Sequence, residues 1–182
     1  MLRTKYTMSD FKGRALTDFI KLQLMKYYRF DRQFTLVVSE CINNADITAL
    51  SQISLVEVEV KISKEDFLKE FDGKSYVKRV KHQRYNSERK YSKYVVPNYF
   101  YFCTTKELAP FIKSYLKEHG YNNYGVLVCC EKRLFNKRSH IETYKQAKKL
   151  HKNRVDNSVF EKVYKRLQSE LITLKEKVLL SS

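Results

Sequence analysis

The sequence has no tryptophan, only four glycines and two prolines, and no run of ~18 apolar residues. So few glycines and prolines exclude a collagen-like or low-complexity chain. The missing apolar run argues against a membrane-spanning helix, and the polar first ten residues are not followed by the apolar core of a signal peptide. We therefore expect a folded protein of the cytoplasm, either in a bacterial cell or in the cytosol of a phage-infected host.

Zinc-binding patterns are absent as well. The four cysteines show no C-x-x-C spacing and the four histidines are scattered, so the sequence does not predict a zinc site. Cys41, Cys103 and Cys129 lie in apolar, strand-like runs, where a free thiol packs as a small hydrophobic side chain. We expect reduced cysteines in the core.

Positive charge is what the sequence has in excess. Lysine and arginine number 36 against 20 aspartates and glutamates, a formal net charge of +16. A charge of this size attracts polyanions and makes their binding sensitive to salt. Nucleic acid is the leading candidate partner. An anionic membrane surface and a surface made soluble by lysine are the alternatives.

Hydrophobic periodicity predicts an α/β (α+β) domain. Apolar residues three and four positions apart indicate a helix at residues 11–28, and short β-branched runs indicate a meander of strands at 34–41, 45–50 and 54–62. Capping signals and apolar runs then predict a helix at 63–71, a strand at 98–103, a helix at 106–119 and a strand at 124–130. We expect a mixed sheet flanked by helices.

A C-terminal helical extension is predicted after this domain. The domain is expected at residues 1–150 and an amphipathic helix at 157–180, where Ser158 and Glu161 resemble a capping box. An apolar stripe follows at steps of three and four residues, formed by Phe160, Val163, Leu167, Leu171 and Leu174. This stripe either packs on its own domain or pairs with a second copy. The length of the helix and the charged, linker-like stretch 148–156 favour a homodimer.

The third predicted strand carries the residues that indicate chemistry. Three valines alternate there with Glu57, Glu59 and Lys61, so the charged side chains share one face of the strand. Taken alone, this alternation favours a solvated outer face of an amphipathic strand. However, Asp46 begins the preceding strand among apolar neighbours, and a meander could bring it close to Glu59. Two carboxylates that converge favour a hard cation such as Mg²⁺ between them, and a nearby lysine can steady an attacking water or a phosphate.

These residues resemble the D…(D/E)-x-K signature of the PD-(D/E)XK nuclease superfamily, and more closely its MmcB-like DNA-repair branch and related phage proteins. The resemblance covers about residues 34–130. It is carried by Ser39-Glu40, Ala45-Asp46-Ile47-Thr48-Ala49-Leu50, Val58-Glu59-Val60-Lys61, Asp66-Phe67 and Asn98-Tyr99-Phe100-Tyr101-Phe102.

The resemblance implies a restriction-endonuclease-like core and a metal-dependent active site. Mg²⁺ or Mn²⁺ would be held by Asp46, Glu59 and the carbonyl of Val60, and Lys61 would be the catalytic lysine. Glu40 matches an upstream acidic position of this branch, where it would hold a metal-bound water or a second ion. Its alternative role is that of a surface carboxylate at a strand end.

A basic, tyrosine-rich insertion at residues 74–96 is longer than the family's usual connection. Within it, Lys81-His82-x-x-Tyr85 resembles a pattern in the phage relatives, and His82 would then face the scissile phosphate or lie on the surface. The side chains expected to bind nucleic acid are Lys78, Arg79, Lys81, His82, Arg84 and Tyr85.

The sequence therefore favours a Mg²⁺-dependent DNA endonuclease that hydrolyses phosphodiester bonds. Two alternatives remain open. One is a DNA-binding module that keeps the nuclease fold without catalysis, and the other is a nuclease that acts on RNA.

Overall fold

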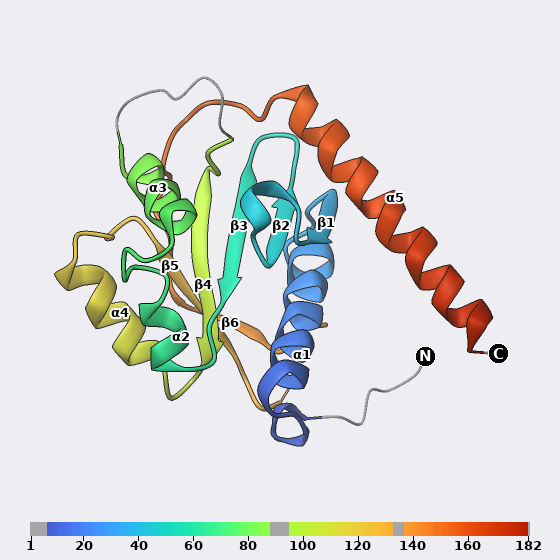
Figure 1. Cartoon of the computed structure of the whole chain (residues 1–182), viewed down its shortest axis with the longest axis horizontal. Coiled ribbons are helices and arrows are strands. Elements are labelled where there is room, and N and C mark those ends of the chain that lie inside the picture. The colour runs from blue at the N-terminus through green and yellow to red at the C-terminus, as the bar shows by residue number, and fades with distance from the viewer. Residues whose placement is uncertain (1–6, 88–94, 133–136, 182) are drawn as a thin grey trace.

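The computed structural model describes residues 7–87, 95–132 and 137–181. In it, runs rich in β-branched residues form one six-stranded sheet. The strand order follows the chain from β1 to β6 (Figure 1). β1 (Leu36–Ser39), β2 (Ile47–Leu50) and β3 (Leu55–Val60) form the expected antiparallel meander. β4 (Tyr99–Thr105) and β5 (Gly125–Cys129) run parallel to β3, and β6 (Ile141–Lys145) returns antiparallel to β5. The fold is therefore mixed α/β.

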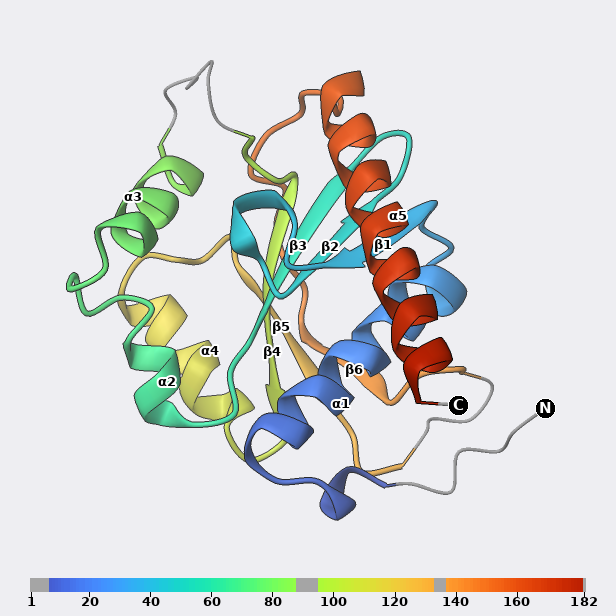
Figure 2. The ribbon, with the colours of Figure 1, turned by 45° about the vertical axis from the view of Figure 1, so that its right-hand side comes forward.

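Helices cover both faces of the sheet. α1 (Gly13–Lys26) packs through Phe19, Ile20 and Leu24 against the valines of β3. The opposite face is covered by α2 (Lys64–Leu68), α3 (Tyr76–Tyr85) and α4 (Ala109–Glu118), and at the β1 end by α5 (Asn157–Leu180) (Figures 1 and 2). Short 3-10 turns, η1 (Met8–Asp10) and η3 (Ile42–Asn44), and a π-helical turn, η2 (Tyr27–Asp31), complete the described elements.

Local signals account for several element ends. Ser63 Oγ accepts the Asp66 N–H and caps α2 as expected, and Gly120 has the left-handed φ of +81° just after α4. α4 begins at Ala109 instead of residue 106, because β4 extends through Thr105. α5 is capped by Asp156, which accepts the Ser158 N–H, so the expected capping box at Ser158 is wrong.

The sequence did not predict β6, and it left the packing of α5 on its own domain as one of two alternatives. β6 is an edge strand that buries only Ile141 fully, so it shows no apolar pattern. Val159 and Val163 of α5 are buried on the domain's own sheet in the cluster around Val38 and Leu50, and Phe160 and Leu167 are partly buried against it.

The stretch 148–156 is fixed to the sheet and is not a linker. Asn98 is buried; its backbone N–H donates to the Leu55 carbonyl and its backbone carbonyl accepts the Leu150 N–H. Its side-chain amide donates to the carbonyls of His151 and Asn153. The expected boundary near residue 150 therefore does not separate α5 from the domain. Among the helices in the described ranges, none is long and apolar enough to cross a lipid bilayer.

Candidate active site

The charged face of β3 is buried. Glu57 is 0% exposed, Lys61 5% and Glu59 9%, which rules out a solvated strand face. The three side chains share the sheet face that is covered by α2, α3 and α4 near β4 and β5. The same face is covered by α5 near β1. Burying a charge is costly unless it is paired and hydrogen-bonded, so each of these groups requires a partner.

Asp46 lies at the end of β3, next to Glu59. Ile47 pairs with Val58 across the hairpin, and the Asp46 Oδ2 accepts the Val60 N–H at 2.8 Å. The other carboxylate oxygen of Asp46 lies 2.8 Å from the Lys21 ammonium of α1. The carboxylate of Asp46 is thus fixed by the backbone between Glu59 and Lys61.

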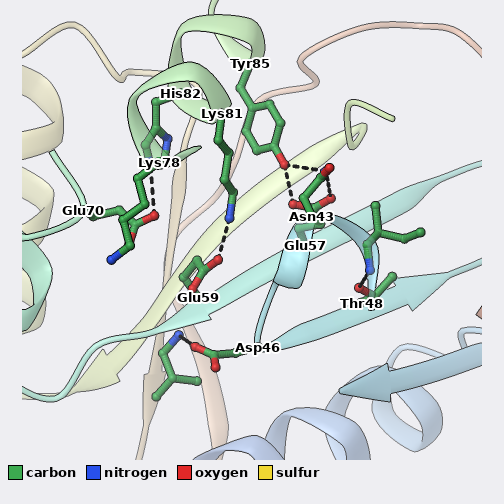
Figure 3. A network of polar contacts seen from close by, with 12 residues as sticks. Asn43, Asp46, Thr48, Glu57, Glu59, Glu70, Lys78, Lys81, His82 and Tyr85 are labelled. Carbon is green, nitrogen blue, oxygen red and sulfur yellow. Dashed lines mark hydrogen bonds and ion pairs between the residues drawn. The ribbon is translucent and has the colours of Figure 1, made fainter. Parts of the chain in front are cut away.

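Each buried carboxylate on this face is paired with side chains of α3 (Figure 3). Lys81 Nζ lies 2.5 Å from Glu59 Oε1, and the Tyr85 hydroxyl donates to Glu57 Oε2 at 2.5 Å. A third carboxylate, Glu70, follows α2. Glu70 contacts Lys61 at 2.8 Å, Lys78 at 3.1 Å and His82 Nε2 at 3.2 Å. α3 therefore closes over the carboxylates through charged and polar contacts.

The three buried glutamates of the cluster differ in the direction of their pKa shifts. Burial raises the pKa of Glu57 to about 7, although Lys81 and the hydrogen bonds from Tyr85 and Asn43 oppose the rise. Burial also raises the pKa of Glu59, against the pull of Lys81. For Glu70 burial is outweighed by His82 and Lys61, which hold its pKa well below the ordinary range. Glu70 is therefore the firmly ionised member of the cluster.

His82 bridges two buried groups. It is buried, and burial lowers the pKa of its imidazole despite the neighbouring Glu70. Because ionised Glu70 can only accept, Nε2 of the neutral ring donates to it, and Nδ1 accepts from the Tyr124 hydroxyl at 2.9 Å. The alternative that His82 lies on the surface is therefore wrong, and its contact with a phosphate stays a prediction.

The six side chains expected to bind nucleic acid divide into two groups. Lys81, His82 and Tyr85 point inward, because residues at these steps share the α3 face that is directed at the sheet. Arg79 is exposed, and Lys78 and Arg84 are partly exposed. The remainder of the basic insertion, at residues 88–94, lies outside the described residues.

Glu40 lies at the rim of this cluster. Its backbone has a left-handed φ of +48°, and its side chain is largely exposed. The Lys21 ammonium contacts Glu40 at 3.3 Å while it contacts Asp46 at 2.8 Å, so this lysine bridges the two carboxylates.

Sequence reasoning missed Glu70, Asn43 and Lys21. Glu70 could have been found, because it lies on one helical face with Phe67 and Phe71 and thus points into an apolar core. Asn43 adopts a turn conformation, with φ +51°, and its amide donates to Glu57, Tyr85 and the Val95 carbonyl.

Within the described residues, no group of three or more His, Cys, Asp or Glu side chains is placed to hold a metal ion. Asp46 and Glu59 are each neutralised by a lysine instead. Comparison of the chain with protein-family models, with curated proteins and with solved structures finds no match. The function must therefore be argued from this geometry.

Proposed function

We propose that the chain is a metal-dependent nuclease that hydrolyses phosphodiester bonds of DNA at Asp46, Glu59 and Lys61. One observation carries the proposal: Asp46 is fixed to the Val60 N–H at the end of β3, beside Glu59 and Lys61. Glu59 interacts electrostatically with both Asp46 and Lys61, and a mixed sheet supports all three residues. The restriction-endonuclease-like identity of this core is part of the proposal.

The donor chemistry of this point suits Mg²⁺ or Mn²⁺. Asp46, Glu59 and the Val60 carbonyl would offer the oxygens that hard cations prefer. When bound, the ion would supply an activated water and neutralise charge on the phosphate. The ammonium groups of Lys21 and Lys81 contact the same two carboxylates and together carry the charge of one divalent cation. Metal binding is therefore an exchange of cations.

Lys61 fits the role of an electrostatic group and not that of a base. Burial lowers the pKa of its ammonium, but Glu70 and Glu59 raise it by more, so the side chain stays charged. A fixed positive charge in a water-poor site stabilises the transition state of phosphate transfer as negative charge builds up. Glu70 holds this ammonium at 2.8 Å and would orient it.

The charge of +16 supports a polyanionic substrate. Exposed Arg79 and the partly exposed Lys78 and Arg84 are the side chains of α3 that would contact phosphates. A DNA-binding module without catalysis is the second candidate, and a specific observation favours it: the lysines already neutralise the carboxylates.

The test measures Mn²⁺ binding by calorimetry and cleavage of plasmid, single-stranded DNA and RNA. Asp46→Asn and Glu59→Gln should abolish both binding of the metal and cleavage, whereas Glu65→Gln, at an exposed position of α2, should change neither. EDTA should stop cleavage. DNA binding without metal binding or cleavage in the wild type would establish the binding module. Cleavage that persists in Asp46→Asn would place the active site elsewhere.

A further inference from the structure

A cavity of about 510 Å³ opens on the face of the sheet opposite to the carboxylates. It lies where η2, the turn between β2 and β3, and the beginning of β4 meet. Val56 and Tyr101 contribute to it from the α1 face of the sheet, whereas Glu57 and Glu59 point to the other face. The cavity is therefore separate from the proposed nuclease site.

Aromatic rings and amides line this cavity, together with one arginine. Of the described residues that line it, five are aromatic, three are glutamines and none is acidic. Tyr28 and Tyr101 are almost wholly buried and form fixed walls, and Tyr28 packs edge-on against Phe34 with ring centroids 5.2 Å apart. A planar ring is the shape that such walls accept.

Two polar groups in the cavity have no partner in the described part of the chain. The Tyr28 hydroxyl makes no hydrogen bond there although the residue is only 3% exposed, and the Arg32 guanidinium makes no hydrogen bond or ion pair. Burial raises the pKa of the Tyr28 and Tyr101 hydroxyls, and Arg32 acts on both in the opposite direction, which places its charge near them. Arg32 is an exposed residue, and the Tyr28 hydroxyl is not among the wholly buried atoms that lack a partner, so both groups are open to solvent and to a ligand in the cavity.

The backbone beside these groups is unusual as well. The chain leaves α1 through the π-helical turn η2, and Gln33 follows with a left-handed φ of +58°. π-helical turns and strained backbone are concentrated at functional sites. Both features position Arg32 at the rim of the cavity.

We propose that this cavity binds a nucleotide, with the base between the tyrosine rings and the phosphate on Arg32. The volume lies within the range of about 300–1,000 Å³ for small-molecule sites. A guanidinium matches the geometry of phosphate oxygens, and the side-chain amide of Gln146, which donates to Tyr101 at 2.7 Å, offers donors and an acceptor to a base edge. The nucleotide is either free or an unpaired residue of a strand. This site goes beyond the proposed nuclease activity and does not depend on it.

The test is calorimetric titration of the full chain with AMP, GMP, CMP and UMP. At least one of them should bind more tightly than adenosine, which lacks the phosphate, and than ribose 5-phosphate, which lacks the base. Arg32→Gln should weaken binding by about tenfold or more, as loss of a charge-assisted hydrogen bond does. Arg29→Gln removes the same charge from an exposed position of η2 that does not line the cavity, and should leave binding unchanged.

Two further arms sharpen the result. Tyr28→Phe removes only the hydroxyl and should weaken binding severalfold, and Asp46→Asn should bind nucleotide as the wild type does, because it alters the other site. A five-residue single strand that displaces the monophosphate at lower concentration would identify an unpaired strand as the source, and failure to displace it would identify the free nucleotide. Equal affinities of Arg32→Gln and Arg29→Gln, or no binding of any nucleotide by the wild type, would overturn the proposal.

Discussion

Lys61 carries a positive charge that is buried, which costs folding free energy unless the charge is paired. Its ammonium is paired with Glu70 at 2.8 Å, so its position does not depend on solvent. An exposed lysine would act mainly by binding phosphate. A buried and oriented one acts chiefly where charge develops during the reaction.

Lys61→Ala should therefore lower the rate at saturating DNA by about 10²–10³-fold while changing the affinity for DNA little. Single-turnover cleavage and equilibrium binding separate the two effects, and Mn²⁺ affinity reports whether the site remains intact. Lys69→Ala, at an exposed lysine just after α2, serves as the control. A variant that binds DNA poorly but cleaves at the normal rate when saturated would make Lys61 a phosphate clamp.

Single residues of the site could be predicted only in part. The alternation in β3 and the position of Asp46 identify a polar strand face and a neighbouring carboxylate from local order alone. That the face is buried depends on α3 and on Glu70, which are 9 or more residues further along the chain. Such contacts are set by packing, and no local pattern of a single sequence encodes them.

α3 is the element that neutralises the site. Lys78, Lys81 and Tyr85 each contact a different carboxylate. The sequence shows here a basic, tyrosine-rich insertion without an apolar stripe, which predicts a surface for nucleic acid but no helix. The helix instead has two different polar faces. One face is buried and contacts carboxylates of the sheet, and the other face is exposed to solvent.

Lys81→Met should raise the affinity for Mn²⁺ by about tenfold or more, because the competing ammonium is removed while the length of the side chain is kept. In EDTA the same variant should lose about 3–5 kcal/mol of unfolding free energy, since Glu59 is left buried and unpaired. Lys78→Met, at a partly exposed position, is the matched control. Metal affinity that is unchanged or weaker in Lys81→Met would contradict the exchange of cations.

Element types were predicted well where apolar periodicity was strong, as in α1, the meander and α5. The predictions failed at β6, whose edge position leaves polar residues outward, and at the start of α4, where the longer β4 sets the boundary. In both places the position of the segment in the fold, and not its local sequence preference, decides the secondary structure.

The whole molecule ends in a helix of which only the first half is covered. Val163 is fully buried, but further along the stripe Leu171 and Leu174 are exposed. The stripe therefore packs on the domain near its beginning and is exposed to solvent near its end. The homodimer suggested by the sequence is retained as a proposal only for this distal half of α5.

A dimer through the distal half should give twice the chain mass in light scattering at micromolar concentration. Leu171→Glu together with Leu174→Glu should convert it to a monomer without unfolding the domain. Ile172→Glu is the control, because Ile172 is also exposed but lies about 100° around the helix from Leu171. A monomeric mass for the wild type across this range would exclude the dimer.

The hydrogen bonds of Asn98 have a consequence for the order in which the molecule is completed. This residue immediately precedes β4, yet its amide donates to the carbonyls of residues 151 and 153, which are synthesised 53 and 55 residues later. Until they arrive, an amide intended for the interior has no protein partner, at a cost of about 1–3 kcal/mol once water is excluded. The sheet therefore closes around Asn98 only after synthesis of the segment that leads into α5.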